Sequence, residues 1–587
     1  MALIEVTNLK YRYPHTEKLA LDGLDFLVEK GSFIGIVGEN KAGKSTLCQA
    51  LVGLVPTMFK GAYGGKIVID GQEAAKTPVA LLCQKVGLIF QNPFNQLSGA
   101  KDTVFGEIAF GLQNLGVPRE EIVRRVEENL RLLDIEQYRD RNPFDLSGGQ
   151  TQRVAIASIL AMQPEIIVLD EPTSQLDPQG SEEVFRVVDK LSKTGITIVM
   201  VEHKMEKLAS YCDKILLLHD GKQIAYDTPE KIFSRDDLEE LGVEAPVFTR
   251  VCRKLSVCRK EEGKRLYPVT MEQTMALRDQ FPAGLSGKRM GAERLGGEAE
   301  RLSHETESQP AAADGLPGEI FRIKDLSFHY LEHVPVMEGL TMKLDARPTA
   351  VIGQNGAGKT TLVKLLKGLL KPVSGTILFS NEDISERTVA QLAGSVGYVF
   401  QNPDDQIFKN RVMDEVMVGP LNIGMNREAA EKRAREALSM VGLLDAAEEN
   451  PYDLDLSERK MVAIASVVAM DTQVLILDEP TIAQDARGRA VIGSIVRKLS
   501  DSGKFVLAIL HDMDFVAEYF ERVIVMAHGK VLADGPKETV FYEADALAAA
   551  KLEQPHTAAL CRKLGYEGAF MTVSDINDRK DGTAEQE

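Results

Sequence analysis

The chain has 587 residues, of which 44% are hydrophobic and 27% are charged, and its formal net charge is −18 at pH 7. This length is three to four times that of a typical domain of about 150 residues, so we expect more than one hydrophobic core. The acidic balance argues against a chain built to hold nucleic acid, which requires a basic surface.

The sequence predicts neither a membrane span nor a secretory signal. Its longest apolar stretches, 154–162 and 462–470, are far shorter than the about 20 residues that a helix needs to cross a bilayer. The N-terminal residues lack the basic-then-apolar order of a signal peptide. Six cysteines, scattered along the chain, fit neither a disulfide framework nor a zinc site. We therefore expect a cytosolic, reduced protein.

A strand expected at 33–38 ends in a glycine-rich loop, and the same arrangement recurs at 349–353. Residues 38–45 and 353–360 both satisfy G-x-x-x-x-G-K-[ST], and a helical pattern follows each. In such loops backbone N–H groups hold phosphates, the lysine reaches the β- and γ-phosphates, and the hydroxyl ligates Mg²⁺. The expected phosphate-binding residues are Gly38, Asn40, Gly43, Lys44, Ser45 and Thr46 in the first loop and Gly353, Asn355, Gly356, Gly358, Lys359, Thr360 and Thr361 in the second.

Two later strands, expected at 165–170 and 474–478, are almost wholly apolar and each leads into an Asp-Glu pair. Such strands are typical of a buried parallel sheet. Asp170 and Asp478 are placed to hold Mg²⁺ through water. Glu171 and Glu479 are candidates for the general base or for the group that positions the attacking water.

These motifs occur twice in the same order, which predicts two copies of one domain. FQNP occurs at 90–93 and 400–403, and VAIAS occurs at 154–158 and 462–466. Alternating strands and helices in each copy favour an α/β fold built on a doubly wound parallel sheet.

We expect the first domain at 2–245 and the second at 319–545. Each is followed by a small C-terminal appendage, at 246–282 and at 546–587, and the latter ends in an acidic tail. We interpret Cys252 and Cys561, which lie in the recurring letters CRKL, as small apolar residues of a packed helix. Residues 283–318 are rich in Gly, Glu, Arg, Ser and Ala, which is typical of a flexible linker.

Residues 146–153 read LSGGQTQR and open a helix whose apolar face is 154–162. Together with the phosphate loops and the acidic pairs, this segment resembles the ATP-binding cassette (ABC) family over nearly all of the chain outside the linker. The resemblance implies two tandem ABC nucleotide-binding domains, each with a P-loop core and a helical signature subdomain. It also implies that two ATP molecules, with Mg²⁺, are sandwiched head to tail between the domains.

The resemblance assigns further roles. The signature residues Ser147, Gly148, Gly149 and Gln150 would bind the γ-phosphate of the ATP held by the opposite phosphate loop. The implied Mg²⁺ ligands are Ser45, Gln91 and Asp170 in the first copy and Thr360, Gln401 and Asp478 in the second, with Gln91 and Gln401 forming sensing loops near the membrane partner. His203 and His511 would act as γ-phosphate switches.

An aromatic residue stacks on adenine in this family, and Tyr13 and Tyr330 fall at the matching positions. Tyr11 and Phe328 lie close by in the sequence and are the alternatives.

The two copies are not equivalent. An ungapped alignment from VAIAS places Asp455 opposite Ser147, although a shift of one or two residues would bring 456–458 into the motif instead. A carboxylate about 5 Å from one phosphate charge costs about 3 kcal/mol at an effective dielectric constant of 20, which is roughly a hundredfold in rate. The first phosphate loop also departs from the pattern, with Lys41 in place of Gly356. In a head-to-tail pair these irregularities meet in one site, so we expect the Lys359 site, completed by the signature at 146–150, to be the main hydrolytic site.

Residues 401–408 and 91–99, and the tails at 246–255 and 554–564, resemble the ATPases of energy-coupling-factor (ECF) transporters. Those complexes import vitamins and transition-metal ions through a membrane coupling protein and a separate substrate-binding membrane protein. The resemblance implies an ATPase peripheral to the cytoplasmic face of the membrane, with the two domains of one chain as a pseudo-dimer. Candidate contacts to the partner are Phe94, Leu97, Asp404, Asp405 and Phe408, which are equally compatible with an ordinary surface loop.

Two other functions share these motifs. A fused ATPase of a sugar or peptide importer would have the same catalytic residues. Only the sensing loops and the tails favour an ECF ATPase over this alternative. A soluble tandem ABC protein acting on ribosomes is disfavoured by the net charge of −18 and by the glycine-rich linker.

Overall fold

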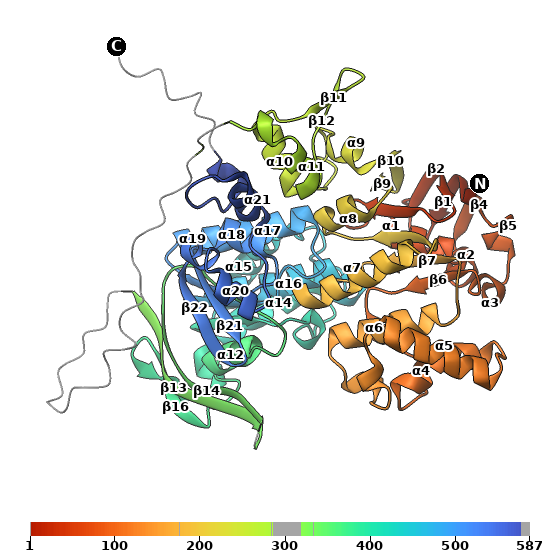
Figure 1. Cartoon of the computed structure of the whole chain (residues 1–587). Helices are drawn as coiled ribbons and strands as arrows, with labels where there is room; N and C mark the ends of the chain where they lie inside the picture. Colours follow the sequence, from red (N-terminus) through yellow and green to blue (C-terminus); the bar gives the residue numbers. More distant parts are fainter. Residues whose placement is uncertain (1, 175, 283–284, 286–317, 333, 577–587) are drawn as a thin grey trace, which may run out of the picture. The chain divides into compact units, whose positions relative to one another are not determined.

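The computed structural model describes residues 2–174, 176–282, 285, 318–332 and 334–576 (Figure 1). These residues divide into two compact units. Unit 1 holds residues from 1–281 together with 482–487, and unit 2 holds those from 282–481 and 488–587. Nearly all of the predicted linker (283–284 and 286–317) and the end of the predicted acidic tail (577–587) lie outside the described residues.

A six-stranded sheet forms the centre of unit 1, in the order β10-β9-β3-β8-β7-β6. Its inner strands are parallel and only the edge strand β10 runs antiparallel. Strands such as β3 are buried at every position, as expected for a parallel sheet covered on both faces. The strands are β3 (Phe33–Val37), β6 (Val86–Ile89), β7 (Ile166–Asp170), β8 (Thr197–Val201), β9 (Lys214–His219) and β10 (Lys222–Asp227).

A second, antiparallel sheet in unit 1 has the order β2-β1-β4-β5. Its strands are β1 (Ala2–Arg12), β2 (Leu21–Glu29), β4 (Ala62–Ile69) and β5 (Gln72–Glu73). The helices before the appendage are α1 (Lys44–Leu51), α2 (Leu54–Thr57), α3 (Val79–Leu82), α4 (Val104–Asn114), α5 (Arg119–Leu132), α6 (Gly148–Leu160), α7 (Pro178–Ser192), α8 (Met205–Tyr211) and α9 (Pro229–Phe233).

Unit 2 repeats this architecture, with sheets in the orders β14-β13-β16-β17 and β18-β19-β20-β15-β21-β22. Its strands are β13 (Glu319–Leu331), β14 (Val334–Asp345), β15 (Thr349–Gly353), β16 (Ser374–Phe379), β17 (Glu382–Asp383), β18 (Val396–Val399), β19 (Val474–Asp478), β20 (Phe505–Ile509), β21 (Arg522–Ala527) and β22 (Lys530–Pro536). Its helices are α12 (Lys359–Leu366), α13 (Val389–Ala393), α14 (Val412–Asn422), α15 (Arg427–Met440), α16 (Leu456–Val468), α17 (Ala486–Asp501), α18 (Met513–Tyr519), α19 (Lys537–Val540), α20 (Ala544–Ala549) and α21 (His556–Leu564). The predicted α/β fold with two copies is therefore confirmed.

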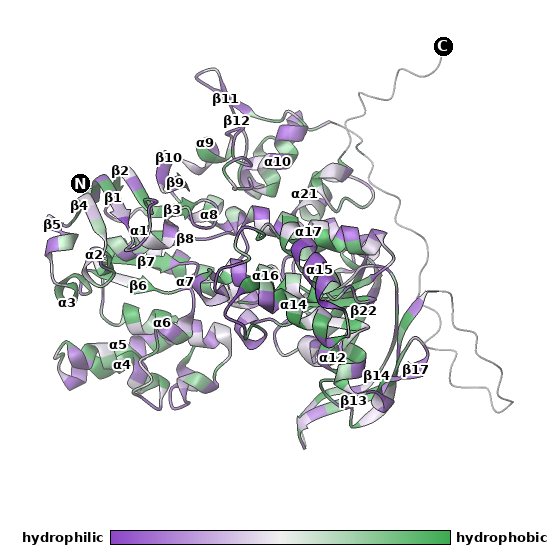
Figure 2. Ribbon diagram, turned by 180° about the vertical axis from the view of Figure 1, so that it is seen from behind, coloured by the Kyte–Doolittle hydropathy of each residue, from purple (hydrophilic) through white to green (hydrophobic). Residues whose placement is uncertain are grey.

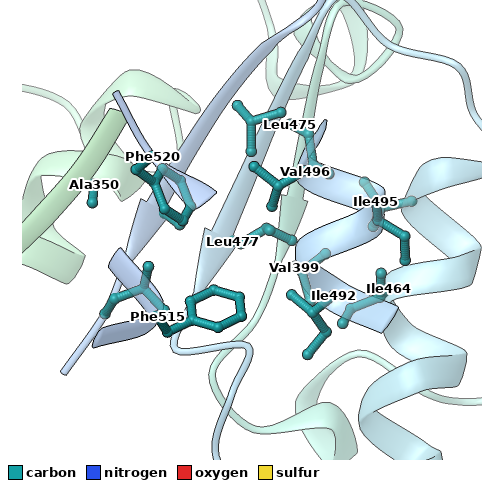
Figure 3. Packing of buried hydrophobic residues seen from close by; sticks show 14 of the residues in the cluster. Ala350, Val399, Ile464, Leu475, Leu477, Ile492, Ile495, Val496, Phe515 and Phe520 are labelled. Atoms are coloured by element: carbon teal, nitrogen blue, oxygen red, sulfur yellow. The ribbon is translucent and has the colours of Figure 1, made fainter. Parts of the chain in front are cut away.

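The core of each unit lies on the two faces of its central sheet. In unit 2, Leu475 and Leu477 of β19 belong to one cluster with Ile492 and Val496 of α17 and with Ile464 of α16 (Figure 3). Hydrophobic residues concentrate in the strands and on inner helix faces, whereas outer helices such as α15 are largely hydrophilic (Figure 2). Because the carboxyl ends of the parallel strands stay fixed by this packing, the loops that follow them are held in place.

The appendage of unit 1 contains α10 (Val247–Lys254), the hairpin strands β11 (Arg259–Glu261) and β12 (Lys264–Leu266), and α11 (Met271–Ala276). Cys252 is fully buried there beside Val257 and Tyr267, and burial raises the pKa of its thiol to about 12. Burial likewise raises the pKa of Cys561 in α21 to about 12. Both cysteines are therefore packing residues, as the sequence predicts.

Among the described residues, none of the helices combines the length and the apolar character that crossing a membrane requires.

Candidate functional site

Each phosphate loop leaves the end of a central strand and turns directly into a helix. Lys44 is the first residue of α1 and is 5% exposed. Its Nζ donates to the carbonyl oxygens of Gly38 at 2.9 Å and Glu39 at 2.8 Å. Burial lowers the pKa of Lys44, against the opposing effect of nearby carboxylates such as Glu171. The lysine therefore lies against a loop of backbone N–H groups, where a phosphate would be held.

The second loop has the same geometry. Lys359 begins α12 and its Nζ donates to Gly353 O at 2.7 Å and Gln354 O at 2.9 Å. The loops differ at one backbone position, where Lys41 adopts a φ of +65° and Gly356 a φ of +78°. A residue with a Cβ in this left-handed region costs roughly 1–2 kcal/mol, whereas glycine adopts it freely. The first loop therefore carries local strain that the second lacks.

The loop, the acidic pair and two predicted partners meet in unit 1. Glu171 is 8% exposed and its backbone φ of +48° lies in the left-handed region. Gln91 Nε2 donates to Glu171 Oε2 at 2.7 Å, and His203 Nε2 lies 2.9 Å from Glu171 Oε1. Burial alone would raise the pKa of Glu171, but the charge of His203 and its hydrogen bond hold it below the usual value. Glu171 is therefore an ionised, rigidly held carboxylate able to accept a proton.

Unit 2 brings the equivalent three residues together. Gln401 Nε2 donates to Glu479 Oε2 at 2.8 Å, and His511 Nε2 lies 2.9 Å from Glu479 Oε1. Glu479 has a φ of +49° and is 7% exposed. Its pKa is raised by burial but lowered further by His511, so the net direction is again downward. Strained backbone of this kind is typical of functional sites.

The residues expected to hold Mg²⁺ offer hard oxygen donors, which is what this ion prefers. Ser45 hydrogen-bonds Asp170, whose Oδ1 is buried without a hydrogen-bond partner. Burial and the neighbouring Glu171 raise the pKa of Asp170 to about 6. In unit 2 the Thr360 hydroxyl donates to Asp478 Oδ1 at 3.4 Å. In unit 1, the buried oxygen of Asp170 that has no donor fits a cation site, so the residues present there suit Mg²⁺.

The aromatic residues near the loops separate into core and surface. Tyr11 is fully buried and its hydroxyl donates to Phe59 O at 2.8 Å, so it belongs to the core. The Tyr13 hydroxyl lies 3.1 Å from Thr46 Oγ1, and the Tyr330 hydroxyl lies 3.2 Å from Thr361 Oγ1. Tyr330 is 58% exposed. Tyr13 and Tyr330 therefore stand beside the helices that begin at the phosphate loops, where an adenine ring could stack on them.

The signature segments are the N-termini of α6 and α16. Ser147 precedes α6 and its N–H donates to Gln150 Oε1 at 3.1 Å. Asp455 precedes α16 in the same place, and its Oδ1 accepts from Glu458 N at 2.9 Å. The ungapped alignment is therefore the one that the structure follows. A Cβ on Gly149 would meet its nearest neighbour at 3.7 Å, so the fold itself does not require glycine there.

The sensing loops are tied to the helical subdomains by buried glutamates. Glu107 of α4 accepts from Ser98 Oγ at 2.8 Å, and Glu415 of α14 accepts from Phe408 N at 3.0 Å. Phe94 and Phe408 are 43% and 62% exposed. Leu97 is 9% exposed and packs in the core. The candidate partner contact at Leu97 is therefore wrong, because the loop turns that side chain inward.

The remaining two candidate contacts have neighbours of their own. Asp404 is paired with Arg459 at 3.0 Å, and Asp405 Oδ1 accepts from Asn402 Nδ2 at 3.5 Å.

Sequence reasoning missed two residues of the second site. Lys460, in α16, is 2% exposed, and its Nζ donates to the carbonyl oxygens of Phe400 (3.2 Å), Gln401 and Asp478 (3.4 Å). The Tyr398 hydroxyl donates to Asp478 Oδ2 at 2.8 Å. The sequence offered one signal for Lys460, which lies just before the apolar run at 462–470 and so on a helix expected to be buried. Lysine is almost never buried without a specific partner, so this position suggested a specific contact.

Comparison with known proteins gives consistent results. The sequence pattern of the family described as "ABC transporter" matches residues 21–174 and 338–482. A "Putative ABC transporter ATP-binding protein" of Methanosarcina mazei is 37% identical over 98% of this chain and 96% of its own. One from Methanosarcina acetivorans is 36% identical over 98% and 93%, and one from Caldanaerobacter subterraneus is 35% identical over 98% of both chains.

Among solved structures, cbiO1 of Clostridium perfringens, described as part of the ABC transporter complex cbiONQ, is 32% identical. It covers 41% of this chain and 93% of its own, with a TM-score of 0.36. The family match and the full-length relatives agree with the two phosphate loops and their Gln-Glu-His clusters. The chain therefore belongs to the ABC transporter family and carries two tandem ABC ATPase domains.

Proposed function

We propose that this chain is the ATP-hydrolysing energy-coupling subunit of a membrane importer of the ECF type, which carries a vitamin or a transition-metal ion. The observation that best supports ATP hydrolysis is the cluster Gln401–Glu479–His511 beside the Lys359 loop. In this proposal the two units close on two ATP molecules, and the signature at 146–150 completes the site built on Lys359.

Hydrolysis in this site follows from the held carboxylate. Glu479 is ionised because His511 lowers its pKa, so it can take a proton from the attacking water. Gln401 and His511 fix both carboxylate oxygens, which limits the carboxylate to one orientation. Bound Mg²⁺ would neutralise developing phosphate charge, and Thr360, Gln401 and Asp478 are the residues that would hold it.

The first site is proposed to bind ATP and to turn over slowly. Its phosphate loop carries Lys41 in left-handed backbone, and the signature proposed to face it begins at Asp455 with a carboxylate. Repulsion between this carboxylate and a phosphate would weaken transition-state binding by about a hundredfold.

The proposed link to the membrane lies at the sensing loops. Exposed Phe94 stacks on exposed Phe144 with ring centroids 6.3 Å apart. In unit 2, Phe408 and Tyr452 are likewise exposed. Exposed aromatic residues are enriched at protein interfaces, and a partner helix seated on them would follow each closure of the units. The ECF assignment rests on the resemblance of the sensing loops and of the C-terminal appendages.

The test is a pull-down of the tagged chain from mild-detergent membranes, with co-purifying proteins identified by mass spectrometry. The proposal expects a coupling protein together with a substrate-binding membrane protein, and the latter would narrow the cargo. Phe94→Ala with Phe408→Ala should reduce this recovery, while Leu81→Ala, another exposed apolar residue, serves as the matched control. Recovery of a sugar or peptide permease, or of ribosomes, would overturn the assigned role and leave the ATPase chemistry standing.

A further inference from the structure

Lys460 is a buried cation that touches two parts of the second nucleotide site at once. It is 2% exposed, and its ammonium group donates to three main-chain carbonyls: Phe400 and Gln401 in the sensing loop and Asp478 at the end of β19. Its removal would leave buried acceptors without this donor, and charge-assisted hydrogen bonds are the strong ones. The ammonium group therefore fastens the sensing loop to the strand that carries Asp478.

Tyr398 holds the same aspartate from another direction. The residue lies in β18 and is 6% exposed. Its hydroxyl donates to Asp478 Oδ2, while Thr360 donates to the other oxygen, Oδ1. Burial raises the pKa of Tyr398, so it remains a protonated donor. Asp478 thus has both carboxylate oxygens and its main-chain oxygen fixed.

Unit 1 has neither contact. Leu88 of β6 stands in the register position of Tyr398 and cannot donate a hydrogen bond. Gln152 stands at the position of Lys460 in α6, and its Nε2 is buried without a hydrogen-bond partner. Asp170 Oδ1 is also without a partner. The two units therefore differ in how firmly their Asp and Gln residues are held, although these residues are identical in sequence.

We propose that Lys460 and Tyr398 are positioning residues that hold Gln401 and Asp478 in their working places before nucleotide binds, and that the lack of both groups leaves the first site less organised. Lys460 also lies about one and a half helical turns from Asp455 at the N-terminus of α16. The helix that begins at the signature segment of unit 2 is therefore joined to Gln401 by one side chain. This inference rests on the proposed ATPase function and extends it.

The experiment compares Lys460→Met and Tyr398→Phe with the matched control Gln152→Met in the full chain. Two quantities are measured: ATP turnover with its KM, and hydrogen exchange of the backbone amides of residues 398–404 without nucleotide. We expect Lys460→Met to lower kcat about tenfold or more, as loss of a charge-assisted hydrogen bond does, with KM changed less than about threefold. Tyr398→Phe should lower kcat about threefold to tenfold. The control should change neither quantity.

Exchange should rise at 398–404 in Lys460→Met and stay unchanged elsewhere in unit 2. Unchanged kcat and unchanged exchange in both variants would overturn the inference. Exchange that rises throughout unit 2 in Lys460→Met would indicate general destabilisation. The inference then depends on Tyr398→Phe, which removes only one oxygen atom, and an unchanged kcat in that variant would overturn it. If Glu479→Gln leaves turnover unaltered, the proposed function itself fails. If Glu479→Gln abolishes turnover while the two positioning variants do not alter it, this inference alone fails.

Discussion

The two units share one fold and the same Gln-Glu-His cluster, yet the residues around their proposed nucleotide sites are held by different contacts. In unit 2, Glu479, Gln401 and Asp478 are held by His511, Lys460 and Tyr398. In unit 1, Glu171 has its Gln and His partners, but Asp170 keeps a buried oxygen without a donor. The comparison teaches that matching motifs do not guarantee matching sites, because the support comes from residues outside the motifs.

A second difference lies one residue before His203 and His511, at Glu202 and Leu510. Glu202 is 3% exposed, accepts from Thr173 Oγ1 at 2.9 Å, and has a pKa raised by burial. Leu510 stands at this place in unit 2 and is fully buried. Unit 1 therefore keeps an extra carboxyl group beside His203, where unit 2 has only an apolar side chain.

The largest effect is expected from giving the first signature the acidic residue that begins the second one. Ser147→Asp keeps a helix cap, since Asp455 caps α16 in the same way. In the proposed pairing of this signature with the Lys359 loop, the new carboxylate would face the phosphate held there. We expect ATP turnover to fall about a hundredfold. The matched control Asp455→Ala should change turnover less than about threefold. Similar losses in both variants, measured by phosphate release, would break the proposed asymmetry.

The histidines give a smaller contrast. His511→Ala removes the hydrogen bond that fixes Glu479 Oε1 and that lowers its pKa. Turnover should fall about tenfold or more, and the acidic limb of the pH–rate profile should move to higher pH because burial then acts on Glu479 with less opposition. His203→Ala should lower turnover less than about threefold. A pH profile that stays in place in His511→Ala would contradict this account of Glu479.

The smallest effect concerns stability rather than turnover. Lys367 follows α12 where Val52 follows α1, and burial lowers its pKa to about 8. Between about pH 8 and 10.5 the folded chain binds fewer protons at Lys367 than the unfolded chain, so this group makes stability rise with pH. Lys367→Met should therefore raise the free energy of unfolding by about 2 kcal/mol at pH 7. This figure already allows about 1 kcal/mol for the Val396 carbonyl that loses its donor.

Calorimetric melts of the wild type and Lys367→Met between pH 7 and 10 check this. The variant should melt at higher temperature at pH 7, and the difference should shrink as the pH rises. A lower melting temperature at pH 7 would show that the hydrogen bond to Val396 outweighs the cost of burying the charge.

Sequence alone predicts the parts of the site that depend on local pattern. The phosphate loops, the strand-ending Asp-Glu pairs and the helix that begins at the signature follow from residue order, because strand, loop and helix-start geometry are local. The choice of Tyr13 over Tyr11 depends on side-chain direction along β1, where Tyr11 points into the core.

Lys460 and Tyr398 could not be assigned this way. Their contacts join β18, the sensing loop, β19 and α16, segments that only the fold brings together. Leu97 shows the reverse case, since a loop residue that reads as exposed is turned into the core. Sequence pattern does not predict which distant segments a single side chain will contact in the folded protein.

The measurement that tests the central claim most directly compares Glu479→Gln with Glu171→Gln in the full chain, by steady-state phosphate release. Both substitutions remove one carboxylate from equivalent positions and keep the size of the side chain. The account predicts that Glu479→Gln lowers turnover about a hundredfold or more, in the range lost with a general base, and that Glu171→Gln lowers it less than about threefold. Equal losses, or a larger loss in Glu171→Gln, would contradict the account.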